Sequence, residues 1–380
     1  MSRKYQICTQ CVMDTTDTEI VFDENGVCSH CHEYEKRKKK FITDPLQREK
    51  ALQGIIQKIK DAGKGKKYDC IVGISGGVDS SYVAYLAKHY ELKALLVHLD
   101  NGWDSELAVK NIEKIVNYTG FDLFTLVVNW EEFKDLQQAF FKADVVDLEL
   151  LSDHAISSTV YKLTRQYNIN YLLSGENFET EAIMPRSWNW RKSDATNIKA
   201  IHKLFGKVKL KTFPFMSTLK KLFYDKTFTA QSINILDYID YNKEKVMKIL
   251  ESEIGWKYYG GKHYESIFTR FYQGYILPKK FNIDKRKAHH STLINSKQIT
   301  REDAIDDLNN DIYPIRLQQE DFELVCKKLD FIQEELQEYI KRPAINHDFY
   351  KTDKYLIENI RKINNIFKYI NRIFTKNKLL

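Results

Sequence analysis

The stretch Tyr68–Ser81, YDCIVGISGGVDSS, decides the fold of this chain. Cys70–Ile74 is an apolar, β-branched run with the length of a strand, and it leads directly into the sequence SGGVDS at 75–80. The apolar-periodic segment that starts at Tyr82 predicts a helix immediately after this loop. A strand, a glycine loop and a helix N-terminus together form an anion site, because glycine lets the backbone approach the ligand and the helix dipole favours negative charge.

The loop is not the GxxxxGK[ST] phosphate loop, since no lysine follows its glycines. Its order of serine, two glycines, aspartate and serine resembles the pyrophosphate loop of the ATP pyrophosphatases. These enzymes split ATP into AMP and pyrophosphate in order to activate an oxygen atom. The alternative is an ordinary glycine-rich turn between strand and helix. Such a turn would not require serine, two glycines, aspartate and serine in this order directly after a strand.

Strand and helix patterns alternate from Tyr68 onward. The strands are expected at 70–74, 94–99, 123–128 and 171–173, and the helices at 79–90, 104–118, 131–142 and 153–167. This alternation predicts an α/β fold, a doubly wound parallel sheet with ligands at the carboxyl ends of its strands. Polar clusters follow three of these strands, at 75–80, 100–103 and 174–177, and their convergence indicates an ATP site.

Four cysteines near the N-terminus form two CxxC pairs, Cys8 with Cys11 and Cys28 with Cys31. The 16 residues between the pairs match the spacing of a structural zinc site. Each pair presents two thiolates to one ion, and four thiolates close a tetrahedron without an open position. The sequence therefore predicts structural Zn²⁺ with a hairpin turn at 23–26, and redox use of the thiols is the alternative.

With 380 residues, the chain is long enough for one large α/β domain and smaller attachments. There is no run of about 18 apolar residues, so no membrane-spanning helix is expected. The N-terminus enters polar sequence directly, which argues against a secretory signal, and we expect a cytoplasmic location. The net charge of +7 comes from basic clusters that are typical of solvated faces and also suit polyanions such as ATP, a nucleotide sugar or RNA.

We expect five parts along the chain. These are a zinc-ribbon module at 1–34, a linker helix at 35–66, the ATP pyrophosphatase core at 67–180, a substrate-binding or covering region at 181–317 and a helical tail at 318–380. The strand pattern fades beyond Glu176, so helices and loops are expected to cover the carboxyl edge of the sheet across 178–275. Apolar periodicity at Leu356, Ile360 and Ile363 predicts that the tail packs on its own domain, with a partner-binding or oligomerisation helix as the alternative.

Beyond the loop, the sequence resembles the N-acetyl sugar amidotransferases of bacterial surface-polysaccharide (O-antigen) and nonulosonic-acid (pseudaminic and legionaminic acid) pathways. The matching stretches, spread from Cys8 to about Ala304, are CTQCVMDTTDTEIVFDENGVCSHC, ISGGVDSSY, HLDNGWDSELA, LLSGENFETEAIMPRSWNW, IKAIHKLFG, GWKYYGGKHYESIFTRFYQGYILPKKFNIDKRKAHHSTLI and QITREDA. The resemblance implies that an acetamido group becomes an acetamidino group at the expense of ATP and ammonia. AMP would be transferred to the amide oxygen with release of pyrophosphate, and ammonia would then displace AMP.

The resemblance also implies a set of ATP-binding positions: Ser75, Gly76, Gly77, Asp79, Ser80, Ser81, Val97, Leu99, Asn101, Gly175, Glu176 and Asn177. Asp79 is a candidate ligand for Mg²⁺, with helix capping as the alternative. Candidates for stabilising anionic groups or carrying protons are Lys262, Glu265, Lys285, Arg286 and His154, together with Arg270 and His263. For each of these, an ordinary structural or surface role is the alternative.

The source of ammonia is expected to lie outside this chain. A glutaminase needs a nucleophilic cysteine, and neither Cys70 nor Cys326 has a suitable sequence context. The resemblance implies a separate glutaminase subunit, accompanied by a barrel protein similar to the histidine-pathway cyclase. Two other classes stay open at this point: a tRNA 2-thiolation enzyme of the same superfamily, and a zinc-ribbon binding module with a vestigial nucleotide fold.

Overall fold

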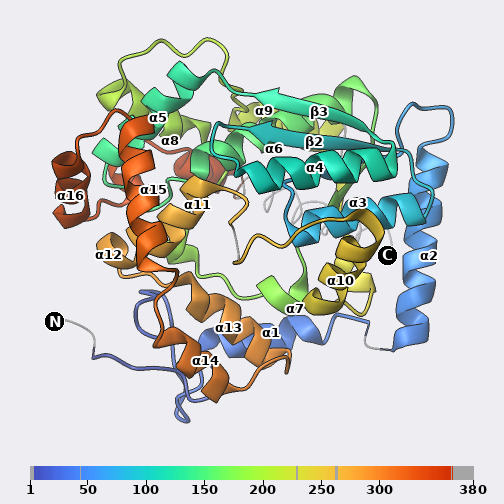
Figure 1. The fold of residues 1–380 in the computed structure, drawn as a ribbon, viewed down its shortest axis with the longest axis horizontal. Helices are drawn as coiled ribbons and strands as arrows, with labels where there is room; N and C mark the ends of the chain where they lie inside the picture. The colour runs from blue at the N-terminus through green and yellow to red at the C-terminus, as the bar shows by residue number, and fades with distance from the viewer. Residues whose placement is uncertain (1–3, 43, 228–229, 262–263, 361, 363–380) are drawn as a thin grey trace, which may run out of the picture.

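A parallel β-sheet forms the centre of the protein (Figure 1). The computed structural model describes residues 4–42, 44–227, 230–261, 264–360 and 362. The five strands are β1 (Cys70–Gly73), β2 (Ala94–Asp100), β3 (Asp122–Val127), β4 (Tyr171–Ser174) and β5 (Gln231–Asn234). They lie in the order β3-β2-β1-β4-β5, and every pair is parallel. The doubly wound α/β fold expected from the sequence is therefore confirmed.

Helices bury both faces of the sheet. One face packs against α2 (Pro45–Ala62), α3 (Val78–His89), α4 (Glu106–Thr119) and α10 (Lys243–Ile254), and the other against α6 (Leu150–Gln166). Side chains alternate across a strand, so Val72 joins the first cluster while Ile71 joins the second. Both positions of β1 are almost completely buried, which explains why this strand appears in the sequence as an unbroken apolar run.

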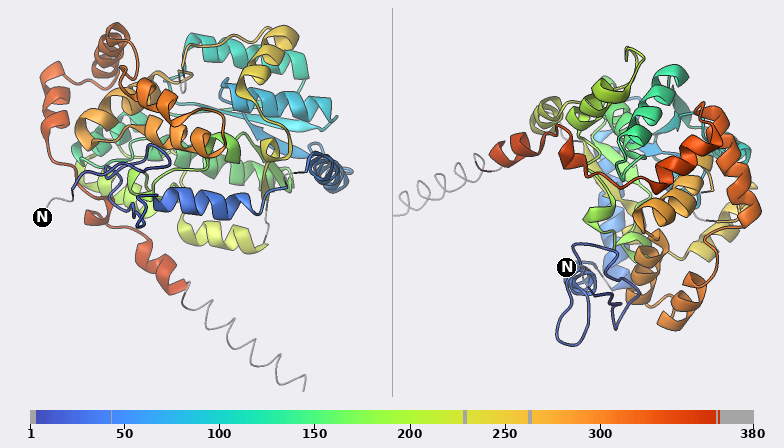
Figure 2. Two further views of the ribbon diagram at one scale, coloured as in Figure 1. Left: turned by 90° about the horizontal axis from the view of Figure 1, so that it is seen from below. Right: turned by 90° about the vertical axis from the view of Figure 1, so that its left-hand side faces the viewer.

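Most of the remaining helices gather at the carboxyl side of the sheet and below it, whereas α9 packs on α6 (Figures 1 and 2). They are α1 (Ser29–Lys38), α5 (Trp130–Lys142), α7 (Phe178–Glu181), α8 (Ala195–Phe205), α9 (Thr218–Thr227), α11 (Ile267–Phe271), α12 (Leu277–Phe281), α13 (Lys285–Asn295), α14 (Arg301–Leu308), α15 (Ile315–Lys328) and α16 (Gln333–Lys341). A π-helical turn, Tyr272–Ile276, joins α11 to α12. Within the described residues, no helix has both the length and the apolar character that a bilayer span requires.

The local predictions agree with the structure through β4 and fail after it. The predicted strands and helices between 70 and 173 match β1 to β4 and α3 to α6 with shifts of a few residues at their ends. The predicted turn at 23–26 is also present, with Gly26 at φ +76° and its N–H donating to the Asp23 carbonyl. The expectation that 178–275 contains only helices and loops is wrong, because β5 extends the sheet beside β4. Its sequence, QSIN, is short and mostly polar, so it carries no strand signal.

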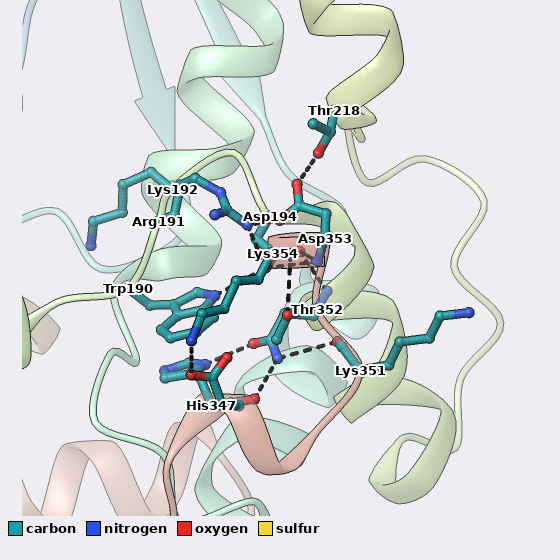
Figure 3. A network of polar contacts seen from close by, with 12 residues as sticks. Trp190, Arg191, Lys192, Asp194, Thr218, His347, Lys351, Thr352, Asp353 and Lys354 are labelled. Carbon is teal, nitrogen blue, oxygen red and sulfur yellow. Dashed lines mark hydrogen bonds and ion pairs between the residues drawn. The ribbon is translucent and has the colours of Figure 1, made fainter. Parts of the chain in front are cut away.

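A buried polar network anchors the C-terminal residues to the loop before α8 (Figure 3). Arg191 forms ion pairs with Asp194 and Asp353, and Asp353 also accepts a hydrogen bond from the Thr218 hydroxyl. Both carboxylates are almost completely buried. The backbone N–H of Asp353 donates to Asp194 as well, so the network fixes where the chain leaves the body of the protein.

We expect Asp353→Ala to lower the free energy of unfolding by about 3 kcal/mol, because it removes one partner of a buried charged network. Denaturant unfolding followed by circular dichroism measures this. Asp348→Ala is the matched control, since Asp348 pairs with Lys354 on the surface and its loss should cost less than about 1 kcal/mol. Equal effects of the two substitutions would contradict the role assigned to the network.

Candidate active site

The site lies where the direction of strand order changes. β2 and β3 extend the sheet on one side of β1, whereas β4 and β5 extend it on the other. In open α/β sheets, ligands bind outside the carboxyl ends of the strands at such a switch point. The loop 75–80 follows β1 and the polar segment 174–177 follows β4, so both meet at this crevice.

The loop backbone is held close to α4, and only glycine fits at its turn. Gly76 has φ +78°, and a Cβ atom there would lie 2.5 Å from the carbonyl oxygen of Ala108. The Gly76 carbonyl accepts hydrogen bonds from Trp256 Nε1 at 3.0 Å and from Asn111 Nδ2 at 3.4 Å. The turn is therefore fixed before any ligand binds.

Serine side chains brace the inside of the loop. The backbone N–H of Ser75 donates to Ser80 Oγ at 3.2 Å, and the two hydroxyl oxygens lie 3.1 Å apart. The N–H of Gly77 donates to Ser75 Oγ at 3.3 Å. Gly77 is the N-cap of α3, so the N-cap residue has no side chain with which to cap the helix. A helix N-terminus at the end of such a loop favours an anion.

Two adjoining cavities open over the loop. The main cavity has a volume of about 800 Å³, and the loop cavity has a volume of about 380 Å³. Ser75, Ser80, Glu176 and Glu265 line both of them, so the two form one continuous site. The predicted positions that line the main cavity are Ser75, Ser80, Val97, Leu99, Glu176, Asn177, Glu265 and Lys285. Those that line the loop cavity but not the main one are Gly77, Asp79 and Gly175.

Other predicted positions lie beside the cavities or away from them. Gly76 and the fully buried Ser81 support the loop from behind. Asn101 lines neither cavity, and its side-chain amide donates to the hydroxyl of Ser152, which does line the main cavity. Lys262 and His263 fall outside the described residues.

Both ring nitrogens of His154 are hydrogen-bonded to backbone groups. Its Nδ1 contacts the Lys192 carbonyl at 2.8 Å, and the Met216 N–H donates to Nε2 at 3.2 Å. This pattern requires the neutral imidazole, and burial lowers the pKa of His154 accordingly. The ring lines neither cavity, so it holds Lys192 and Met216, on either side of α8, to α6 rather than facing a substrate.

Two of the predicted cationic residues, Arg270 and Arg286, form ion pairs with carboxylates of the protein itself. Arg270 makes a bidentate ion pair with the buried Asp321 at 2.7 and 2.8 Å. Arg286 binds Asp284 and also donates to the Asp307 carbonyl at 2.8 Å. Neither lines the main cavity, whereas Lys285 reaches it beside Glu149, 3.3 Å away.

The structure adds site residues that the sequence patterns did not reveal. They are Arg37 of α1, His98 of β2, Asp237 after β5, Tyr241 before α10, Tyr259 in the segment 255–261 and His289 of α13. Tyr241 donates its hydroxyl to Asp79, and the Val78 N–H donates to the Tyr259 hydroxyl at 3.3 Å. The clustered aromatic residues of GWKYYGG were the one available sequence signal for Tyr259.

The site concentrates negative charge. Burial raises the pKa of Glu176, and the neighbouring carboxylates of Glu181, Asp153 and Asp237 raise it further. Burial likewise raises the pKa of Asp237. His98 is different: burial disfavours its charged form, but the hydrogen bond to Asp104 at 3.1 Å, the charges of Asp104 and Asp100 and the contact with the Ile74 carbonyl together raise its pKa. Hard oxygen ligands around a phosphate-type loop are the donor set that Mg²⁺ prefers.

The segment that starts at Glu265 is joined to the sheet beside the loop. The Ser105 N–H donates to the Glu265 carbonyl at 2.9 Å, and the Ile267 N–H donates to the Trp103 carbonyl at 2.8 Å. Asp104 and Ser266 form an antiparallel bridge between these two bonds. The Glu265 side chain is thereby brought over Gly77, where a Cβ atom would lie 3.7 Å from its carboxyl carbon.

The four N-terminal cysteines form a compact, buried cluster. Their Sγ atoms lie within 4.8 Å of one another, with separations of 3.9 Å for Cys8–Cys31 and 3.7 Å for Cys11–Cys28 and Cys28–Cys31. A tetrahedron with Zn–S distances of about 2.3 Å has edges of roughly 3.8 Å, so the arrangement is consistent with zinc. None of the four forms a disulfide.

The cysteine cluster is docked on α13 and α14. Asn295 donates to Cys31 Sγ at 3.5 Å and accepts from the Gln10 side chain at 2.7 Å. Arg301 donates to the Cys8 and Cys11 carbonyls, at 3.0 Å in both cases. Since α13 begins at Lys285, the cluster braces the helix that presents Lys285 and His289 to the main cavity.

Comparisons with known proteins match two separate parts of the chain. Residues 265–364 match the family described as LPS biosynthesis protein WbpG-like, C-terminal domain, and residues 69–177 match the asparagine synthase family. No curated protein matches the chain. Among solved structures, an NH3-dependent NAD synthetase from Campylobacter jejuni subsp. jejuni NCTC 11168, in complex with the nitrate ion, is 14% identical, with a TM-score of 0.32, covering 70% of this chain and 99% of that one. An NMN synthetase from Francisella tularensis is 12% identical, with a TM-score of 0.31, covering 80% of this chain and 99% of that one.

Gly76→Ala should abolish ATP binding, because the new Cβ displaces the loop from the Ala108 carbonyl. Gly65→Ala is a matched control, since Gly65 also has a positive φ, +74°, but a Cβ atom there would meet nothing within 4 Å. Gly65→Ala should lose about 1 kcal/mol of stability from backbone strain, Gly76→Ala should lose more because its Cβ also clashes with Ala108, and only Gly76→Ala should lose ATP binding in calorimetric titration. Retained ATP affinity in Gly76→Ala would contradict the loop assignment.

The cysteine cluster should hold one zinc ion per chain by elemental analysis of the purified protein. Cys28→Ser should lose the metal and lower the melting temperature, because the cluster and α13 support each other. Cys326→Ser, a buried cysteine far from the cluster in sequence, should keep the metal. Full metal content in Cys28→Ser would show that the cluster is not the zinc site.

Proposed function

Because the chain combines an ATP pyrophosphatase domain of the asparagine synthase family with the C-terminal domain of WbpG-like LPS biosynthesis proteins, we propose that it is an ATP-dependent amidotransferase acting on an N-acetyl sugar. It converts the acetamido group to an acetamidino group. ATP supplies an AMP group to the amide oxygen, and ammonia supplies the nitrogen. The product belongs to a surface polysaccharide or a nonulosonic acid.

The shared cavity supports this proposal most directly. Ser75, Ser80 and Glu176 reach it from the region of the asparagine synthase match, and Glu265 and Lys285 reach it from the region of the WbpG-like match. Each family's segment forms one wall of a single cavity of about 800 Å³. That volume lies in the upper part of the range for small-molecule sites, which suits two organic substrates side by side.

The chemistry follows from the poor leaving ability of an amide oxygen. The amide oxygen attacks the α-phosphorus of ATP, a new P–O bond forms, and the bond to pyrophosphate breaks. Ammonia then attacks the activated carbon, loses a proton, and the C–O bond breaks to release AMP. The balance is one ATP and one ammonia consumed for one amidine, one AMP and one pyrophosphate.

The loop at 75–80 is the part of the site that we assign to binding the pyrophosphate that leaves ATP. Its backbone N–H groups, the Ser75 and Ser80 hydroxyls and the N-terminus of α3 all favour negative charge. The carboxylates of Asp79, Glu176 and Glu265 line the same space and would repel the triphosphate without a cation. They fit Mg²⁺, which when bound neutralises the charge that develops on the phosphates.

Lys285 and Glu265 are our candidates for contact with the reacting groups. The Lys285 ammonium is placed to stabilise the α-phosphate or an anionic group of the sugar, and Glu265 to accept the proton that ammonia loses. Ammonia itself is proposed to come from a separate glutaminase subunit with a cyclase-like barrel protein. In the described residues, no cysteine lines either cavity, so the chain offers no glutaminase nucleophile there and no second thiol of the kind many tRNA thiolases use.

The proposal is tested with mass spectrometry of N-acetyl sugars, UDP-sugars and CMP-sugars incubated with the protein, ATP, Mg²⁺ and ammonium. The product should be lighter than the starting sugar by the mass difference between an oxygen atom and an NH group. AMP should appear in an amount equal to that of the amidine product. Glutamine in place of ammonium should give no product with this chain alone.

Ser80→Ala and Asp79→Ala should each abolish AMP release together with amidine formation. Arg316→Ala serves as the control, because Arg316 pairs with Glu320 on the exposed surface of α15. AMP release with tRNA but with none of the sugars would overturn the proposal in favour of a thiolation enzyme. Turnover with glutamine alone would remove the need for a separate glutaminase.

A further inference from the structure

The stretch 195–224 is rich in lysine and contains no acidic residue. It has seven lysines and no arginine, aspartate or glutamate. With 52 acidic residues among 380, an average stretch of this length in the chain would contain about four. The stretch covers α8, the loop between α8 and α9, and the first part of α9. Such a one-sided composition is typical of a surface that meets a polyanion.

Six of the seven lysines are exposed, and none of the six forms an ion pair among the described residues. The seventh, Lys221, pairs with Asp225. Two acidic residues lie beneath the loop: Glu132 and Asp135 of α5 are buried and accept hydrogen bonds from backbone N–H groups between 207 and 213. The loop is thereby held in place while its lysine side chains stay in solvent. The exposed lysines are Lys199, Lys203, Lys207, Lys209, Lys211 and Lys220.

Apolar side chains are exposed between these lysines. Leu204 is 65% exposed, Leu219 is 60% exposed and Val208 is 36% exposed. Each of the three is next to an exposed lysine in the sequence. Proteins that rest on a lipid interface combine residues in this way, because the apolar side chains enter between the headgroups while the ammonium groups meet the phosphates.

Contacts between the segments join these side chains into one surface. The Lys199 Nζ atom of α8 lies 4.6 Å from the centre of the Phe215 ring, in the segment before α9. Thr218, at the start of α9, donates to Asp353, and the Asp353 N–H donates to Asp194, the N-cap of α8 (Figure 3). The starts of α8 and α9 are therefore fixed by the same buried network.

Helix α6 separates this surface from the candidate active site. Ser152, Asp153 and Ile156 of α6 line the main cavity, whereas His154 binds the Lys192 carbonyl and the Met216 N–H on either side of α8. No residue of 195–224 lines the main cavity or the loop cavity. The exposed lysines are thus placed to meet an anion other than the ATP in the proposed site.

The side chains of this surface favour a lipid over a nucleic acid. RNA-binding surfaces use the guanidinium plane of arginine and aromatic rings for stacking on bases, and the stretch contains no arginine. RNA would also leave the exposed leucines beside a charged backbone. An anionic bilayer attracts the lysines and removes the leucines from water at the same time.

We propose that the basic face, defined by the six exposed lysines with Leu204, Val208 and Leu219, binds the anionic surface of a phospholipid bilayer. The inference goes beyond the proposed function and does not depend on it. Binding is peripheral: the lysines contact the headgroups and the three apolar side chains enter the interface. The main cavity stays outside the contact, on the other side of α6.

The test is flotation of the whole chain with vesicles of phosphatidylcholine alone or of phosphatidylcholine mixed with phosphatidylglycerol. The wild-type protein should bind only the mixed vesicles, and added NaCl should weaken the binding. The triple variant Lys207→Gln, Lys209→Gln and Lys211→Gln should bind about a hundredfold more weakly, because each lysine near an anionic surface contributes about fivefold.

The matched control removes the same charge elsewhere. Lys50→Gln, Lys58→Gln and Lys88→Gln alter exposed positions of α2 and α3, against the opposite face of the sheet from α6, and should keep wild-type binding. Leu204→Ser with Leu219→Ser should weaken binding about tenfold, at high salt as well as low, since it removes the apolar part of the contact. All three variants change exposed side chains, so their melting temperatures should match that of the wild type.

The outcomes separate this inference from the proposed reaction. No vesicle binding by the wild-type protein, equal binding to neutral and mixed vesicles, or equal losses in the lysine variant and its control would overturn the basic face. Binding of tRNA that the lysine variant weakens, without vesicle binding, would assign the face to RNA and overturn the proposal. Vesicle binding through the basic face without amidine formation would support this inference and refute the reaction, and amidine formation without vesicle binding would do the reverse.

Discussion

The docking of the four-cysteine cluster on α13 is the contact on which the complete cavity depends. The sheet and its helices pack through their own apolar clusters, so the loop after β1 needs little from the rest of the chain. The opposite wall belongs to a separate apolar cluster, which contains Phe268 and Phe271 of α11, Ala288 of α13 and the four N-terminal cysteines. It is carried by α13, whose far end is tied to the cluster through Asn295 and whose start presents Lys285. The cysteine cluster thereby supports one wall of the cavity without lining it.

A second contact that shapes the cavity is the short antiparallel pairing between residues 103–105 and 265–267. It places the start of the C-terminal region directly beside the phosphate-type loop, and the buried Trp103 closes the gap beneath it. In the function we propose, ATP chemistry and substrate recognition therefore fall to different segments of sequence that meet beside the loop. This division explains how one nucleotide core can serve different acceptors when only the covering region changes.

Sequence reasoning succeeded where the signal was local and failed where the site was assembled from distant segments. The loop at 75–80, the two CxxC pairs and the first four strands each carry their own pattern of residue types and spacing. Arg37 and Asp237 carry none, since each reaches the cavity only because α1 and the segment after β5 fold onto it. His154 and Arg286 were plausible chemically, but their partners, the Met216 N–H and Asp284, are visible only in three dimensions. Lys262 lies outside the described residues and stays a prediction.

The separation in sequence between the cysteine cluster and its docking site has a consequence for biosynthesis. Asn295 is 264 residues from Cys31, and Arg301 is 293 residues from Cys8. At about 5–20 residues per second, a ribosome needs on the order of tens of seconds to deliver α13 after the cluster has emerged. During that interval the small module lacks its contacts with α13 and α14, and a captured metal would hold its thiols together. When α13 has been made, it completes a wall of the cavity that the N-terminal module then supports.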